Sequence, residues 1–251
     1  LAPYEDRIKY IYKENGGACS ARNLGLEMSQ GEYIACLDCD DLWLPEKLEK
    51  SVAVLDADPM LAFVFSRCYT IDAKGDTIDE VGYSFDPDDT YRCLLYENYV
   101  IAPTVLMRRA CLDRVGCFDE SIFIPADWDL WLRLAKHFPI ASIDCALSKY
   151  RLASNYTLRN VEQCIRESAY VIEKQFQASP ELLDTEKRRI KGCMLVTNGM
   201  FYRKLADAAN ARSMLGRAIR MYPYDWRPYV HFFLSLFGCS AWNTLANSKR
   251  A

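Results

Sequence analysis

The chain has 251 residues, which is enough for one sizeable α/β domain and a smaller appendage. Its composition, 51% apolar and 26% charged, is that of an ordinary globular protein. The net charge of −3 argues against nucleic acid as a partner, because phosphate binding needs a basic face, and no apolar run reaches the roughly 18 residues of a membrane-spanning helix.

The first part of the chain alternates short apolar runs with amphipathic segments. Residues 8–13 predict a short edge strand, and 20–29 predict a helix with Ser20 as its N-cap. The continuous apolar run 33–37 predicts a strand that helices bury on both faces, as in a parallel sheet. Further helices are expected at 45–56, 90–98, 109–115 and 127–137, and further strands at 61–69, 104–107, 140–143 and 147–152. This alternation predicts a three-layer α/β domain over residues 1–157.

The rest of the chain, residues 158–251, shows no strand pattern. Residues 161–177, 181–202, 205–222 and 225–237 all suit helices, so we expect an all-helical C-terminal region after a boundary near residue 157. Its least polar stretch, 229–246, is interrupted by four polar residues and predicts a buried helix, with a helix lying on a membrane surface as the alternative.

Eleven cysteines are scattered along the chain. Cys36 and Cys39 have C-x-x-C spacing, but no second close pair follows and the two histidines are distant, which argues against a zinc site. Scattered cysteines are typical of small buried side chains in a reducing compartment, so we expect a cytoplasmic protein.

An acidic cluster, Asp38, Asp40 and Asp41, follows the apolar run 33–37 directly. Ligands of open α/β sheets bind at the carboxyl ends of strands, and three carboxylates placed there repel one another unless a positive charge compensates them. Mg²⁺ and Mn²⁺ prefer oxygen ligands, so this D-x-D pattern predicts a site for a metal and a diphosphate. Alternatively, Asp40 or Asp41 only begins the next helix or is solvated in a loop.

The segment 125–133 carries a second candidate residue, Asp127. On a helix, Asp129 and Arg133 are four residues apart and are expected to pair on an outer face. Asp127 lies about 200° around the helix from Asp129 and points elsewhere. It is interpreted as a general base that takes a proton from a sugar hydroxyl, or alternatively as an N-cap carboxylate.

The loop Gly16-Gly17, followed by a predicted helix with Arg22, is the third feature. Glycines permit close backbone approach, and a helix N-terminus favours anions, so Arg22 is a candidate ligand of a phosphate or ribose. An ordinary loop with a surface arginine is the alternative.

In this order, these segments resemble the family-2 glycosyltransferases of the GT-A fold. The runs GGACSARNLGL (16–26), GEYIA (31–35), LDCDDLWLPEKL (37–48), VGCFDE (115–120) and DWDLWLRL (127–134) carry the likeness, which covers roughly residues 8–157. The resemblance implies a GT-A-like (Rossmann-like) mixed sheet with helices on both faces. The family's opening strands and their Asp-Asp-Gly-Ser-like turn have no counterpart here, which predicts an N-terminally truncated member.

By this resemblance, the protein moves a sugar from a nucleotide-diphosphate donor to a hydroxyl acceptor with inversion, in polysaccharide or glycoconjugate synthesis. Asp40 binds Mn²⁺ or Mg²⁺, and Asp38 lies near the ribose and diphosphate of the donor. Arg22 and Asn23 line the donor pocket. The implied donor is a UDP-sugar.

On the acceptor side, the resemblance makes Asp127 the catalytic base and places Trp128 and Thr104 nearby. The implied acceptor is a saccharide or a lipid-linked molecule, so the inner face of the membrane is an alternative location and peripheral membrane contact stays open. Ala126 stands where the family usually has a glutamate. No oligomeric state is predicted.

Two other classes of function are weighed against this one. An inactive relative or fragment could serve as a binding or scaffold subunit through its helical tail. A nucleotidyltransferase shares α/β architecture and a metal-held diphosphate, but its usual glycine-rich loop with a basic residue is not seen here.

Overall fold

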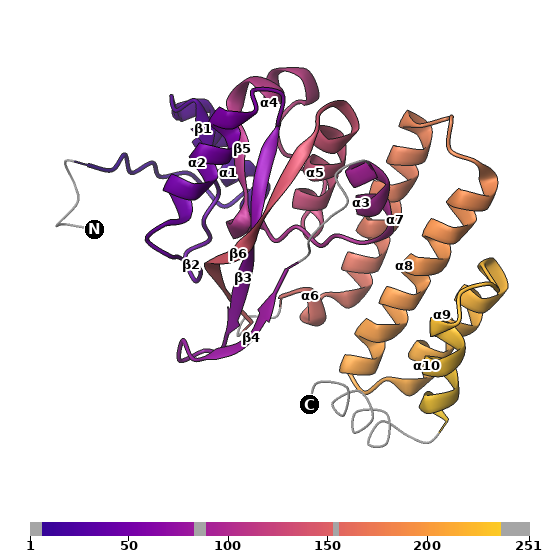
Figure 1. The fold of residues 1–251 in the computed structure, drawn as a ribbon. Coiled ribbons are helices and arrows are strands. Elements are labelled where there is room, and N and C mark those ends of the chain that lie inside the picture. The colour runs from indigo at the N-terminus through magenta and orange to yellow at the C-terminus, as the bar shows by residue number, and fades with distance from the viewer. Residues whose placement is uncertain (1–6, 83–88, 153–155, 237–251) are drawn as a thin grey trace.

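The computed structural model describes residues 7–82, 89–152 and 156–236. Its first part combines a sheet with helices (Figure 1). In chain order, the elements of this part are α1 (Gly17–Met28), β1 (Tyr33–Ile34), β2 (Leu42–Trp43), α2 (Lys47–Ala57), β3 (Phe63–Ile71), β4 (Thr77–Val81), α3 (Thr90–Tyr96), the 3₁₀ turn η3 (Ala102–Thr104), β5 (Leu106–Arg108), α4 (Arg109–Val115), α5 (Ala126–His137) and β6 (Ile140–Arg151).

The sheet is mixed, with the strand order β1-β5-β3-β6-β2 and with β4 paired to β3. Its longest pairing is parallel and joins β3 to β6, whereas the other pairings are antiparallel. Phe63 in β3 is fully buried and its ring centroid lies 5.2 Å from that of Trp131 in α5. The β3–β6 pair is therefore the centre of the fold.

Helices cover both faces of this sheet, as the sequence predicts. On one face, Leu55 of α2 packs with Val64 and Leu106 from the strands. On the other face, residues of α1, α3, α4 and α5 form a larger core with Phe63 and Met107.

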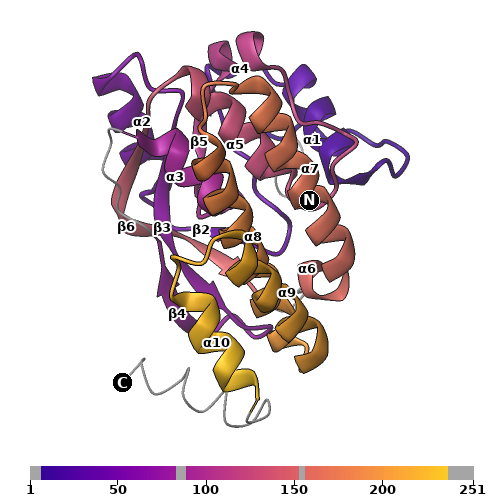
Figure 2. The ribbon, with the colours of Figure 1, turned by 90° about the vertical axis from the view of Figure 1, so that its right-hand side faces the viewer.

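The second part of the structure is helical, with α6 (Tyr156–Arg159), α7 (Val161–Ala178), α8 (Asp184–Lys204), α9 (Ala208–Met221) and α10 (Arg227–Ser235). Figure 2 shows this helical part from the side, and α8 lies between α7 and α9. Val171 and Phe176 of α7 join the same core as α5, whereas Leu195 and Leu215 belong to a second cluster formed by α8 and α9. The first core thus contains residues from both sides of residue 157. The domain boundary expected near that residue stays a prediction.

Two expectations for the N-terminal residues are wrong. Residues 8–16 form no strand, because no described strand pairs with them, and Tyr10 and Tyr12 are exposed. The first helix begins at Gly17 rather than at Ser20. The reason is that Gly17 adopts a positive φ of 86° and donates its N–H to Asn15, while the Ser20 hydroxyl accepts a hydrogen bond from Lys13 instead of capping the helix.

The expected strand 33–37 is also shorter than its apolar run. Only Tyr33 and Ile34 pair, and they pair antiparallel with β5 at one edge of the described sheet. Leu37 is 45% exposed, so the run is not buried on both faces. The strand expected at 104–107 is divided between η3 and β5, and the two strands expected after residue 139 form the single strand β6.

The stretch 229–246 is described only in its first part, which belongs to α10. There Tyr229 and Val230 are each 43% exposed, so the expectation of a buried helix is wrong for this part, and residues 237–246 lie outside the described residues. Across the ranges that the structure describes, each helix is too short or too polar to span a bilayer.

Candidate active site

The acidic cluster forms a turn between β1 and β2, in which the backbone N–H of Asp41 donates to the backbone oxygen of Asp38 at 3.1 Å. Asp38 is exposed, and its carboxylate accepts two contacts from Nη2 of Arg22, at 2.7 Å to Oδ1 and 3.0 Å to Oδ2. The guanidinium of Arg22 also stacks over the ring of Phe118, 5.5 Å from its centroid. Arg22 therefore brings a fixed positive charge to the cluster, and its predicted contact with a phosphate or ribose stays a prediction.

Arg151, at the end of β6, fixes the other half of this turn. Its Nε donates to the backbone oxygen of Asp40 at 2.9 Å, and its Nη1 donates to Asp72 and Ala73 in the β3–β4 turn. Its backbone N–H reaches Oδ1 of Asp41 at 2.9 Å. Sequence reasoning missed this role, because nothing in the chain pattern shows that residues 40, 72 and 151 meet.

Asp41 is buried, and within the described structure its second oxygen, Oδ2, has no hydrogen-bond partner. Burial raises the pKa of this carboxyl to about 6, although the N–H of Arg151 acts against the shift. Through its bond to the backbone of Arg151, the buried Asp41 joins the turn to the end of β6.

Asp40 is the carboxylate that is left for a metal ion. It is half-buried, and among the residues described its carboxylate takes part in no hydrogen bond or ion pair. The described residues also hold no group of three or more acidic, histidine or cysteine side chains suited to a metal. A single free carboxylate fits Mg²⁺ or Mn²⁺, because these ions commonly use one or two carboxylates and take further ligands from substrate phosphates and water.

Asp127 lies in the first turn of α5 and is partly buried. Its Oδ1 accepts hydrogen bonds from the N–H of Trp128 at 2.7 Å and from Nδ2 of Asn98 at 3.3 Å. Burial raises the pKa of its carboxyl to about 6, while the bond from Trp128 and the charge of Arg22 act against the shift and the charge of Asp38 adds to it. The structure thus brings Asp127, Arg22 and Asp38 within electrostatic reach of one another.

The two residues predicted on the acceptor side are both buried. The hydroxyl of Thr104 donates to Ile101 at 2.7 Å, and Nε1 of Trp128 donates to Leu94 at 2.8 Å. Thr104 thus supports the turn η3 and Trp128 joins α5 to α3, and their acceptor-side role stays a prediction.

Three side-chain donors, which the sequence alone did not reveal, fix η3. Trp43 and Ser148 both donate to the backbone oxygen of Pro103, at 2.9 and 3.0 Å. Lys47 is buried and donates from Nζ to Thr104 at 2.6 Å. Burial lowers the pKa of the Lys47 amine to about 8, because removal from water disfavours the charged form.

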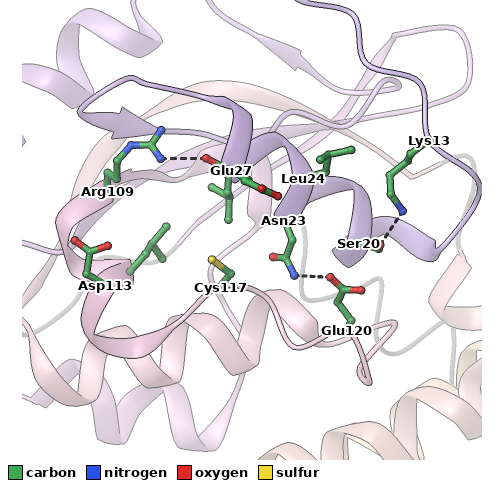
Figure 3. A pocket seen from close by; sticks show the side chains of 11 residues that line it. Lys13, Ser20, Asn23, Leu24, Glu27, Arg109, Asp113, Cys117 and Glu120 are labelled. Carbon is green, nitrogen blue, oxygen red and sulfur yellow. Dashed lines mark hydrogen bonds between the residues drawn. The ribbon is translucent and has the colours of Figure 1, made fainter.

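Asn23 has a structural partner. Its amide exchanges hydrogen bonds with the backbone of Phe118 at 2.9 and 3.0 Å, and it also donates to Glu120. Figure 3 shows Asn23 and Glu120 at an open hollow between α1 and α4, which none of Arg22, Asp38, Asp40 and Asp127 lines. The predicted contact of Asn23 with a donor stays a prediction.

Asp129 corrects the expectation of an outer-face ion pair. It is fully buried, with one oxygen 2.8 Å from Nε of Arg133 and the other 2.9 Å from Nζ of Lys174. Helix α7 covers this side of α5, and the residue spacing within α5 alone contains no sign of that contact.

Comparisons with known proteins find relatives of this chain among glycosyltransferases. Residues 1–116 match the family model of glycosyl transferase family 2. An uncharacterized glycosyltransferase of Rickettsia conorii is 28% identical over 82% of this chain and 36% of its own length. The UDP-Glc:alpha-D-GlcNAc-diphosphoundecaprenol beta-1,3-glucosyltransferase of Escherichia coli is 32% identical over 60% of this chain and 58% of its own.

Among solved structures, TarS of S. aureus (residues 1–349) superposes with a TM-score of 0.58 at 18% identity, over 99% of this chain and 77% of that one. This likeness shows the fold and agrees with the predicted GT-A-like α/β arrangement followed by helices. The chain spans only about a third of the Rickettsia conorii relative, 36% of its length.

Proposed function

Because the chain belongs to glycosyl transferase family 2, we propose that the protein is an inverting transferase that moves a sugar from a nucleoside-diphosphate donor to a hydroxyl acceptor. The observation that carries this proposal is Asp127, a partly buried carboxylate with a pKa raised to about 6 beside the Arg22–Asp38 pair. Polysaccharide or glycoconjugate synthesis is the proposed setting, in line with the Escherichia coli relative.

On the donor side, we assign Asp38, Asp40 and Arg22 to the ribose and diphosphate. Arg22 holds Asp38 in one orientation, and Arg151 holds the backbone of Asp40, so both carboxylates are positioned before a donor arrives. Asp40 would hold Mn²⁺ or Mg²⁺, an ion that supplies positive charge for the leaving diphosphate.

On the acceptor side, we assign the proton transfer to Asp127. Its carboxylate takes the proton of the acceptor hydroxyl as that oxygen forms a bond to the anomeric carbon and the bond to the diphosphate breaks. A base with a pKa of about 6 is ionised at neutral pH and accepts a proton more readily than an ordinary aspartate does. A single displacement of this kind inverts the anomeric centre.

For the substrates, we propose a UDP-sugar donor and a saccharide or lipid-linked acceptor. The Escherichia coli relative supports both choices, since its name states a UDP-glucose donor and an acceptor linked to diphosphoundecaprenol. We further propose that the protein acts in the cytoplasm, at the inner face of the membrane, where such an acceptor would be reached.

The test is sugar transfer by the full-length protein, assayed with Mn²⁺ and a panel of nucleotide sugars. Asp127→Asn and Asp40→Ala are assayed beside Asp113→Asn, which changes an exposed aspartate on α4. We expect transfer by the parent and by Asp113→Asn, and losses of about 10²-fold or more in the other two variants. The absence of transfer with every donor would contradict the proposal and favour an inactive binding subunit.

A further inference from the structure

The loop 116–125 leads from α4 into α5 and ends two residues before Asp127. Its middle is held from the side of α1, where Asn23 bonds the backbone of Phe118 and the thiol of Cys19 donates to the oxygen of Ile122 at 3.2 Å. Phe123 lies against α1 as well, because a side chain at Gly17 would meet its ring at 3.4 Å. None of these contacts uses the backbone N–H groups of Phe123 and Ile124, near the end of the loop.

Helix α7 provides that second support. Oε2 of Glu167 accepts the backbone N–H groups of Phe123 and Ile124, at 3.0 and 2.9 Å, and its Oε1 accepts from Gln163 at 2.8 Å. One carboxylate thus satisfies two successive backbone donors that no helix or strand can use.

Lys174 lies seven residues after Glu167, which is two helical turns, so both side chains face the same loop. Its Nζ is 2.8 Å from Asp119 in the loop and 2.9 Å from Asp129 in α5. Helix α7 therefore contacts the loop at two places, near Asp119 and at Phe123 and Ile124, as well as the first turn of α5.

We propose that Glu167 of the C-terminal helical region is a positioning residue for the catalytic base, because it fixes the loop end from which the first turn of α5 carries Asp127. This inference rests on the proposed function of Asp127. Between Ile124 and Asp127 stand only Pro125, whose ring restricts φ, and Ala126, which is buried. A shift of the Glu167-bound backbone is therefore passed to Asp127 over three residues, and displacements of about 1 Å can cost about 10²-fold in rate.

Asp127 and Glu167 both lie beyond residues 1–116, the part that matches the family model. The base is thus supported from a separate helix of the C-terminal region, α7. A role of this kind predicts that a change at Glu167 alters the chemical step and the surroundings of Asp127 while donor binding is kept.

The experiment compares Glu167→Ala and Glu167→Gln with Glu162→Gln, a change of an exposed residue on the same helix. In the full-length protein, kcat and the KM for the donor are measured, and the carboxyl of Asp127 is titrated by NMR. We expect Glu167→Ala to lose about tenfold or more in kcat with KM changed less than about threefold. Glu167→Gln keeps an acceptor oxygen but turns a donor toward Gln163, so we expect an intermediate loss.

The titration separates positioning from a merely structural role. Loosening of the loop admits water to Asp127, so its pKa should fall toward the ordinary aspartate value in Glu167→Ala and stay unchanged in Glu162→Gln. The change at Glu167 leaves in place the other charged and titratable groups that interact with Asp127, which are Arg22, Asp38, Cys19, Cys36, Tyr150 and Cys164.

Two results would overturn the inference: a kcat equal to that of Glu162→Gln, or a lower kcat with an unchanged pKa of Asp127. Failure of the proposed function would give another result in the transfer assay. Asp127→Asn would then transfer sugar at the parent rate, or the parent protein would not transfer sugar at all. In that case the titration still decides whether Glu167 sets the surroundings of Asp127.

Discussion

Arg22 of α1 holds Asp38 through one nitrogen, Nη2, which lies 2.7 Å from Oδ1 and 3.0 Å from Oδ2 of that carboxylate. This pair joins the loop after β1 to the first helix and keeps positive charge beside Asp127. The proposed donor site is therefore ordered before a nucleotide sugar binds.

Replacement of Arg22 by lysine tests whether Arg22 orders the donor site before the donor binds. A lysine keeps the charge but cannot both stack on Phe118 and present a planar guanidinium to Asp38. We expect Arg22→Lys to weaken the binding of uridine diphosphate with Mn²⁺ by about tenfold, measured by calorimetry. Arg114→Lys, at an exposed position on α4, is the control, and equal affinities in the two variants would count against the role of Arg22.

The buried carboxyl of Asp41 should make the fold less stable at high pH. Its folded pKa of about 6 lies above the ordinary value of about 4, so the folded state binds more protons between these pH values. The free energy of unfolding therefore falls as the pH rises from about 4 to about 6, and the penalty is complete above that window.

Asp41→Asn removes this penalty and keeps an oxygen for the N–H of Arg151. We expect the variant to be more stable than the parent by about 1–2 kcal/mol at pH 8 and by little near pH 4, measured by urea unfolding with EDTA present. A difference that is the same at both pH values would show that Asp41 is not the titrating group. Asp113→Asn serves as the exposed control.

The buried ion pairs of Asp129 predict a large loss of stability. Asp129→Asn takes away the buried carboxylate that Arg133 and Lys174 share, although the two cations are themselves 17% and 31% exposed. We expect the free energy of unfolding to fall by about 2–3 kcal/mol, because Arg133 loses its carboxylate while Lys174 keeps Asp119. A loss below about 1 kcal/mol would mean that solvent or another group takes over the role of Asp129.

The parts of the fold that were predicted correctly depend on local signals. Helix α4 has the expected bounds because Gly116 ends it at a φ of 79°, which glycine adopts easily. The acidic cluster was found because carboxylates directly follow an apolar run. Strands β2 and β4, by contrast, were missed, since their pairing partners β6 and β3 are decided by contacts between distant residues.

The same limit explains the errors at the site. The amphipathic pattern of α5 separates Asp127 from Asp129 correctly, but it cannot show that α7 buries Asp129. Likewise, the sequence marks Arg151 and Lys47 only as charged residues, whereas their roles come from backbone oxygens supplied by other loops. The types and spacing of residues in the sequence were therefore enough to locate the candidate site. The side chains that face it are determined by contacts between segments far apart in the chain.

The pH dependence of kcat tests the central claim, that Asp127 is the catalytic base, most directly. A base must be ionised, so with a pKa of about 6 its activity is present above that pH and lost below it. We predict that kcat for sugar transfer, measured with saturating donor and Mn²⁺, falls about tenfold for each pH unit below about 6, and that Asp127→Asn lacks this limb. A kcat that stays level down to pH 4.5 in the parent, or an Asp127→Asn variant with the same acidic limb, would contradict the assignment.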